Sequence, residues 1–135
     1  MLEDTKIDVK LKLAALWASV MFCYIYADYF GLYVPGMLQS MLKGNMGPFG
    51  RTTQSVLLLC SAMMSIPSVM IFLSVVLRPR LNQWLNVIAG LLFTAIILKT
   101  MWGWQFYIYY GVIEIALTLL VVWYAWRWPK STAPA

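Results

Sequence analysis

Four long apolar runs dominate the chain, and each is long enough to cross a lipid bilayer. They cover residues 13–34, 52–77, 81–101 and 103–126. A spanning helix needs about 20 apolar residues to cross a hydrocarbon core of about 30 Å. The runs are continuous rather than alternating, and they are too long for the strands of a membrane β-barrel. We therefore predict an all-α, polytopic membrane protein built as a bundle of four transmembrane helices.

The segments between the runs differ in length and in pattern. Segment 35–51 is long and still apolar, and four of its residues would share one face of a helix before glycines break the pattern: Met37, Leu38, Met41 and Leu42. We predict a short interfacial helix in this loop, with a merely flexible outer loop as the alternative. Around Gly103, in contrast, almost nothing separates the third run from the fourth, so we expect a tight helical hairpin.

The ten basic residues lie mostly beside the runs, and their distribution predicts the orientation of the chain. Residues 1–12, the middle connection and residues 127–135 should share one side of the membrane, and the other two connections the opposite side. The first side holds seven basic residues, namely Lys6, Lys10, Lys12, Arg78, Arg80, Arg127 and Lys130, and the second holds Lys43, Arg51 and Lys99. We therefore expect the N-terminus and the C-terminal tail to lie in the cytoplasm. Separately, we expect the last five residues, at the end of the chain, to be disordered.

Composition identifies the main partner as the lipid bilayer. The 135 residues suffice for one domain, and 62% of them are hydrophobic while 11% are charged. A soluble domain is nearer a quarter charged, because its surface must face water. The net charge of +5 is explained by membrane topology, so we expect no nucleic-acid partner. A second copy of the chain or another membrane subunit is the further class of partner that the sequence allows.

Several kinds of chemistry lack their residues. The chain has no histidine, which excludes His-dependent acid–base catalysis and His-ligated metals. Cys23 and Cys60 are far apart in the sequence and lie inside apolar runs, as buried cysteines without a redox role do. We therefore expect no enzyme activity, no bound metal and no cofactor.

Three ionisable residues lie within the apolar runs, where an unpaired charge costs at least about 2.5 kcal/mol near the bilayer centre. They are Asp28, Lys99 and Glu114. At 1.5 Å per residue, Asp28 and Lys99 both fall roughly 5–8 Å below the outer surface. Since their charges are opposite, we predict a structural ion pair between the first and third spans. Glu114 lies about 15 Å inside the interface, close to the midplane and without a basic residue at its own level.

Glu114 shares one face of its helix with Tyr110 and Thr118, and Tyr24 shares a face of the first helix with Asp28. Together these five residues predict a polar, aromatic-lined pocket that opens outward under the first loop. Without a cation beside it, a carboxyl at this depth is expected to hold its proton. A purely structural hydrogen bond between helices is the alternative for Glu114, and contact with another subunit is a third possibility.

Two stretches carry a resemblance to a known group of proteins: Asp28-Tyr-Phe-Gly-Leu-Tyr-Val-Pro-Gly36 and Tyr109-Tyr-Gly-Val-Ile-Glu114. With the size and the long first loop, they resemble an uncharacterised family of small four-helix bacterial inner-membrane proteins, similar in layout to DoxX-like proteins. This resemblance implies an inner-membrane location. It implies no activity. DoxX is associated with a quinone-linked oxidoreductase, but this chain has no redox motif, so that role is not carried over. The small multidrug resistance transporters, which are similar in size, offer only an analogy of mechanism.

Two functions follow as expectations. The first is a small membrane protein whose outward-facing pocket binds or helps transport a small lipophilic or cationic molecule. The alternative is a non-catalytic accessory or assembly subunit of a larger membrane complex, in which the polar residues serve packing. The orientation of Glu114, toward a cavity, a helix or lipid, discriminates between them.

Overall fold

The computed structural model describes residues 1–130, and within them the chain is helical, as predicted. In chain order the elements are α1 (Val9–Gly31), α2 (Met37–Leu42), a 3₁₀ turn (Gly47–Phe49), α3 (Gln54–Val76), α4 (Pro79–Thr100) and α5 (Gln105–Trp126). Four of these helices, α1, α3, α4 and α5, are long and apolar enough to cross a membrane. The predicted disorder of the last five residues lies outside the described part of the chain.

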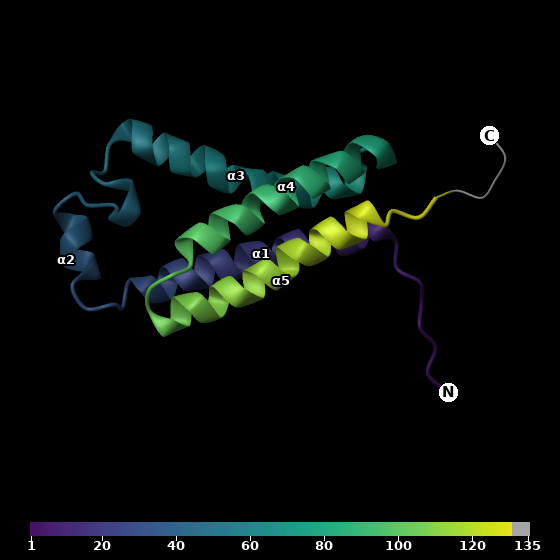
Figure 1. Cartoon of the computed structure of the whole chain (residues 1–135), viewed down its shortest axis with the longest axis horizontal. Helices are drawn as coiled ribbons and strands as arrows, with labels where there is room; N and C mark the ends of the chain where they lie inside the picture. Colours follow the sequence, from purple (N-terminus) through teal and green to yellow (C-terminus); the bar gives the residue numbers. More distant parts are fainter. Residues whose placement is uncertain (131–135) are drawn as a thin grey trace.

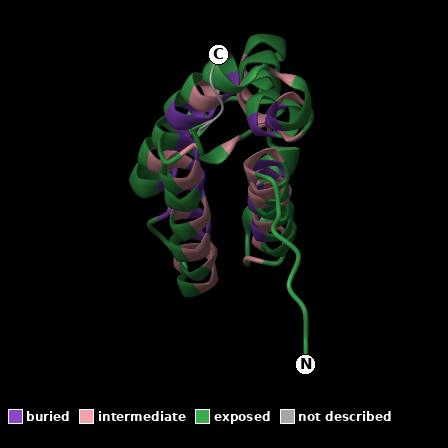
Figure 2. Ribbon diagram, turned by 90° about the vertical axis from the view of Figure 1, so that its right-hand side faces the viewer, coloured by how far each residue is buried: buried purple, intermediate pink, exposed green. Residues whose placement is uncertain are grey.

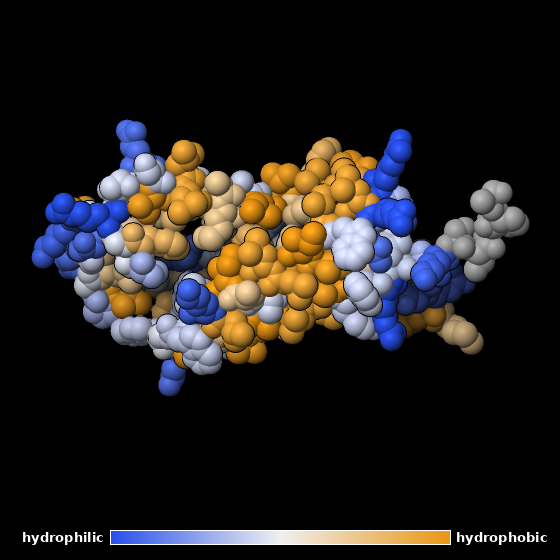
Figure 3. All heavy atoms as spheres, turned by 45° about the horizontal axis from the view of Figure 1, so that its top comes forward, coloured by the Kyte–Doolittle hydropathy of each residue, from blue (hydrophilic) through white to orange (hydrophobic). Residues whose placement is uncertain are grey.

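The four long helices form a bundle in which each packs most extensively against two others. Going round the bundle, α1 contacts α5, α5 contacts α4, α4 contacts α3, and α3 contacts α1. The start of α1 and the end of α5 lie at the same end of the bundle, and α2 lies at the other (Figure 1). We call these the termini end and the α2 end. The face of the molecule seen in Figure 3 is largely hydrophobic between two more hydrophilic ends, as a multi-pass membrane protein requires.

Local sequence explains the helix boundaries. α1 starts at Val9, four residues before the predicted span, because the side chain of Asp8 accepts a hydrogen bond from the Lys10 amide (2.8 Å) and caps the helix. α4 begins with Pro79 in its first turn, a position that needs no amide donor. Gly103 has a φ of +154°, which favours glycine, and it forms the tight turn between α4 and α5.

The short helix α2 forms at the four apolar residues that predicted it. None of its residues is buried, and the side chain of Leu42 is 88% exposed. Its apolar side chains are therefore exposed, as suits a helix at a membrane interface.

The hairpin of α4 and α5 is the tightest part of the bundle. A Cβ added at Gly90 of α4 would lie 2.7 Å from Cγ2 of Val122 and 3.2 Å from the carbonyl oxygen of Thr118. A Cβ added at Gly111 of α5 would lie 2.6 Å from the Cβ of Met101. Small residues let helices approach this closely in membranes.

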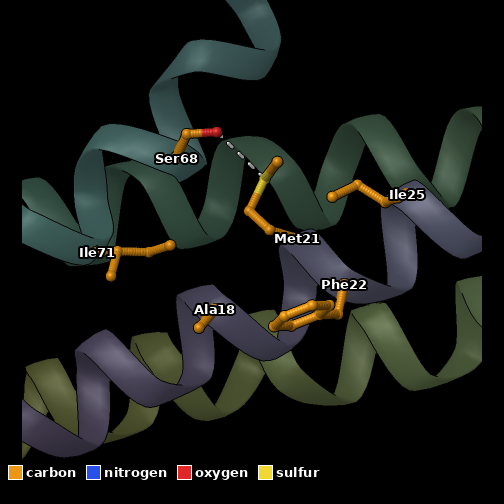
Figure 4. Close-up of a pocket in the computed structure, with 6 residues that line it drawn as sticks. All are labelled: Ala18, Met21, Phe22, Ile25, Ser68 and Ile71. Atoms are coloured by element: carbon orange, nitrogen blue, oxygen red, sulfur yellow. Dashed lines mark hydrogen bonds between the residues drawn. The ribbon is translucent and has the colours of Figure 1, made fainter.

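Helix α3 is the least buried of the four spans. Figure 2 shows how buried and exposed residues are distributed over the bundle. The three buried residues of α3 are Pro67, Met70 and Ser74, whereas no residue from Gln54 to Ile66 is buried. Pro67 lacks the amide hydrogen that would continue the helical bonding, and helices bend at such positions. Figure 4 shows that α3 changes direction beside Ser68, so its first half diverges from α1.

Candidate functional site

A hydrogen-bonded polar network lies in the half of the bundle nearer the termini. The indole N–H of Trp17 donates to Oδ1 of Asn86 (2.7 Å), and the Ser74 hydroxyl donates to the same oxygen (3.3 Å). The Asn86 amide donates to Oδ1 of Asn82 (2.7 Å), whose own amide donates to the Ser74 carbonyl (2.7 Å). All four side chains are fully buried. The network therefore ties α1, α3 and α4 together with its donors and acceptors paired.

The sequence reasoning missed this network. Asn82 and Asn86 are four residues apart and so share one face of a helix, which was an available signal. Their partners were not available, because Trp17 is 69 positions away from Asn86 and reads as an ordinary aromatic residue of an apolar run.

Phe93 of α4 marks the boundary between this network and the half nearer α2. Its ring is fully buried and makes edge contacts with the rings of Trp17 (6.2 Å between centroids) and Tyr24 (6.4 Å). Trp17 belongs to the polar network, and Tyr24 lies two turns further along α1. Between Tyr24 and the termini end, the helices enclose the polar network. Toward the α2 end, the polar side chains are arranged differently.

Three of the predicted site residues come together beyond Phe93. Glu114 of α5 is 4% exposed, and its carboxyl lies within electrostatic range of both Tyr24 and Asp28 of α1. Tyr107 of α5, two turns from Glu114 on the same face, lies within range of the same two carboxyls. We call Tyr24, Asp28, Tyr107 and Glu114 the acidic site. The spacing of seven residues between Tyr107 and Glu114 places both on one face of α5.

Two polar atoms of the acidic site are buried without a partner. The Tyr24 hydroxyl and Oε1 of Glu114 have no hydrogen-bond partner among the described residues. An unpaired buried polar group costs about 1–3 kcal/mol, so each such group calls for a specific explanation. Asp28, in contrast, is exposed on the surface of the bundle.

Two other predicted site residues have different surroundings. The Thr118 hydroxyl is buried and engaged with the Thr94 hydroxyl (2.7 Å), where it joins α5 to α4 one turn from Glu114. The ring of Tyr110 stacks on Phe30 of α1 (6.5 Å between centroids) and helps to close the α1–α5 interface. We therefore assign both residues to packing beside the acidic site.

Among residues 1–130, which the structure describes, Asp28 and Lys99 do not form the predicted ion pair. Both side chains are exposed, and their helices, α1 and α4, lie diagonally across the bundle rather than next to each other. Equal depth along the membrane normal placed them at one level but left open the order of the helices around the bundle. Lys99 lies in the last turn of α4, where a cation interacts favourably with the helix dipole.

A groove of about 270 Å³ lies between α1 and α3, beside the bend of α3. Figure 4 shows its lining residues, which are Ala18, Met21, Phe22, Ile25, Ser68 and Ile71.

Within residues 1–130 there is no group of three Cys, Asp or Glu residues that could hold a metal ion.

Comparison with known proteins gives a family but no activity. Residues 3–134 match a family of unknown function (DUF6326). The chain belongs to this family. The match agrees with the predicted membership of an uncharacterised family, and it gives no support to the predicted likeness to DoxX-like proteins. Searches of the curated proteins and of the solved structures find no match.

Proposed function

We propose that this membrane protein binds, and helps to move, a small cationic or lipophilic molecule at the acidic site. The observation that carries the proposal is the pair of buried atoms, the Tyr24 hydroxyl and Glu114 Oε1, which have no partner among residues 1–130 and lie within electrostatic range of the Asp28 carboxyl. In a bilayer, an ionisable residue within a span is by default a functional candidate. Binding or transport is favoured over catalysis, since the chain has no histidine.

Charge decides which kind of ligand suits the site. Asp28 and Glu114 supply two carboxyls, and Tyr24 and Tyr107 supply phenol rings whose faces attract cations. Two carboxyls close together repel each other when both are ionised, and a bound cation relieves that repulsion. A positively charged or proton-carrying molecule therefore complements this site better than an anion does.

The contrast with nearby polar groups argues against a purely structural role for Glu114. One turn away, the hydroxyls of Thr118 and Thr94 pair with each other, and the asparagine network is also paired. The polar groups that hold the helices together thus have hydrogen-bond partners. Oε1 of Glu114 has none among the described residues.

The test is the thermal stability of the purified protein in an uncharged detergent with lipophilic cations and with neutral amphiphiles. A ligand that binds only the folded state raises the melting temperature. We expect cations to stabilise the wild type, and to do so more strongly at higher pH because protons compete for the same carboxyls. Glu114→Gln should keep the fold and lose most of the shift.

Two outcomes would contradict the proposal. A stabilisation that is equal in the wild type and in Glu114→Gln would place binding elsewhere on the protein. No stabilisation by any cation at either pH would favour the accessory-subunit role, for which the uncovered first half of α3 offers a surface.

We further infer that the protein resides in a bacterial inner membrane with both termini in the cytoplasm. The excess of basic residues at the termini end supports this orientation. In a variant without Cys23 and Cys60, an impermeant thiol reagent added outside should label a cysteine at Asn45 and spare one at Lys130. Labelling at position 130 alone would reverse the orientation.

A further inference from the structure

We propose that the ligand of the acidic site is an amphiphilic cation, whose apolar chain lies in the groove between α1 and α3 and whose charged group reaches Asp28 and Glu114. This inference rests on the proposed function and adds the chemical class of the ligand and its route of entry. It is carried by the groove, by its continuity with Asp28 and by the absence of cover from α3.

The groove presents an almost wholly apolar lining. Its one hydroxyl, that of Ser68, bonds within the protein, to the Met64 carbonyl oxygen (3.0 Å) and to the sulfur of Met21 (3.6 Å). Ala18, Phe22 and Ile25 line it from α1, and Ala18 contributes only a methyl group (Figure 4). A methionine in the lining adds adaptability, because its flexible side chain can accommodate different apolar shapes.

The groove runs along α1 toward the acidic site. Met21, Ile25 and Asp28 are spaced by four and then three residues, so they lie on one face of the helix. Asp28 therefore follows the last groove residue by about one turn, roughly 4.5 Å along the axis. An alkyl chain in the groove would place an attached cationic group beside the Asp28 carboxyl.

The bend in α3 leaves this path open from the side. Asp28 is exposed, although it shares a face of α1 with the buried Trp17. Thr100 is likewise exposed, although it lies seven residues after the buried Phe93 on the same face of α4. The first half of α3, which would cover both faces if it stayed close to the bundle, has no buried residue. A molecule dissolved in the bilayer can therefore reach Asp28 from the side.

Charge complementarity selects the occupant among amphiphiles. An anionic head group would meet Asp28 and Glu114 with the same sign of charge, and a neutral one would leave the carboxyls without a counter-charge. Only the cationic amphiphile gains from both the groove and the carboxyls. Glu114, 4% exposed and with an unpaired oxygen, lies beyond Asp28 as the second acceptor.

The experiment compares tetramethylammonium with butyl-, hexyl- and octyl-trimethylammonium, using the thermal shift of the full chain in an uncharged detergent. Since each buried methylene adds to affinity, we expect the octyl compound to bind at least about tenfold more tightly than tetramethylammonium. Ala18→Trp, which fills the groove, should remove the dependence on chain length. Ala18→Leu is the milder variant if the tryptophan variant does not fold.

The chain offers a matched control. A second apolar hollow, lined by Ala116, Leu119, Leu120 and Trp123, lies on α5. Ala116→Trp adds the same side chain there and should leave the binding series unchanged. Octyl sulfate and octanol test the sign of the charge and should give no shift that depends on Glu114.

The outcomes separate the two proposals. If all cations bind equally and depend on Glu114, the acidic site stands and the groove is overturned. If Ala18→Trp and Ala116→Trp have the same effect, the groove is also overturned. If no cation, short or long, shifts the melting temperature in a manner that depends on Glu114, both proposals fall. A chain-length effect removed by Ala18→Trp alone establishes the groove.

Discussion

The two halves of this bundle treat their polar residues in opposite ways. Near the termini, Trp17, Ser74, Asn82 and Asn86 are fully buried, and their side chains bond to one another or to the backbone. Beyond Phe93, the Glu114 carboxyl is almost as deeply buried and has an oxygen without a partner among the described residues. The same helices thus hold a closed polar network at one end and an unpaired acidic group toward the other.

The difference originates in α3. The hairpin of α4 and α5 is tight in both halves, as the close contacts at Gly90 and Gly111 show. Helix α3 contributes fully buried residues to the bundle only from Pro67 onward, and its Ser74 completes the asparagine network. Because lipid cannot satisfy polar groups, the covered half needs its internal partners, and the uncovered half leaves polar groups available to a ligand.

The largest expected effect comes from breaking the paired half. Asn86→Leu removes the acceptor used by Trp17 and Ser74 and strands the Asn82 oxygen. Each stranded group costs about 1–3 kcal/mol in soluble proteins and less in membranes, so we expect a loss of about 2–4 kcal/mol. Unfolding in mixed micelles, followed by tryptophan fluorescence, measures this loss.

The control is Thr100→Leu on the same helix, since the Thr100 hydroxyl bonds only to the backbone of its own helix at Ile96. We expect the control to unfold like the wild type. Equal stability of Asn86→Leu and the control would remove the network from the account.

How far the sequence predicts this molecule can be seen from the same residues. Hydrophobic pattern and glycine placement predict four spans, the short helix at Met37 and the turn at Gly103, because these depend on local sequence. The acidic site was predictable in part, since Tyr24 with Asp28, and Tyr107 with Glu114, are spaced for a common face. The Asn86 network was not, because its partners on α1 and α3 are set by the order of helices around the bundle.

The next effect concerns the helix hairpin that is common to both halves. Gly90→Ala places a methyl group against Val122 and the Thr118 backbone, and overpacking of this kind costs about 1–3 kcal/mol. Gly31→Ala is the matched control, because nothing lies within 4 Å of its added Cβ. Thermal unfolding should show a clear loss for Gly90→Ala and none for Gly31→Ala. Similar melting temperatures for the two variants would contradict the tight crossing.

A change at the bend of α3 sharpens the comparison in another way. Pro67→Ala restores one backbone N–H donor. The extra hydrogen bond should raise the free energy of unfolding by about 1 kcal/mol. A straighter α3 would cover Asp28, so we expect weaker stabilisation by octyl-trimethylammonium than in the wild type. An unchanged or larger ligand shift would show that the bend does not control access.

The smallest expected effect concerns Lys99. Lys99→Met at this exposed position should alter the unfolding free energy by less than about 0.5 kcal/mol. The diagonal placement of α1 and α4 predicts that the effects of Lys99→Met and Asp28→Asn simply add. A double variant that recovers the loss caused by either single change would restore the ion pair predicted from the sequence.

The most direct test of the contrast between the two halves is the ligand-free stability of Glu114→Met. Methionine is similar in length to glutamate and brings no polar atom, so it removes a buried oxygen that has no partner among residues 1–130. The account predicts a gain in unfolding free energy of about 1 kcal/mol over the wild type, with loss of cation binding. A loss of stability comparable to that of Asn86→Leu would show that Glu114 holds the bundle together, and it would contradict the account.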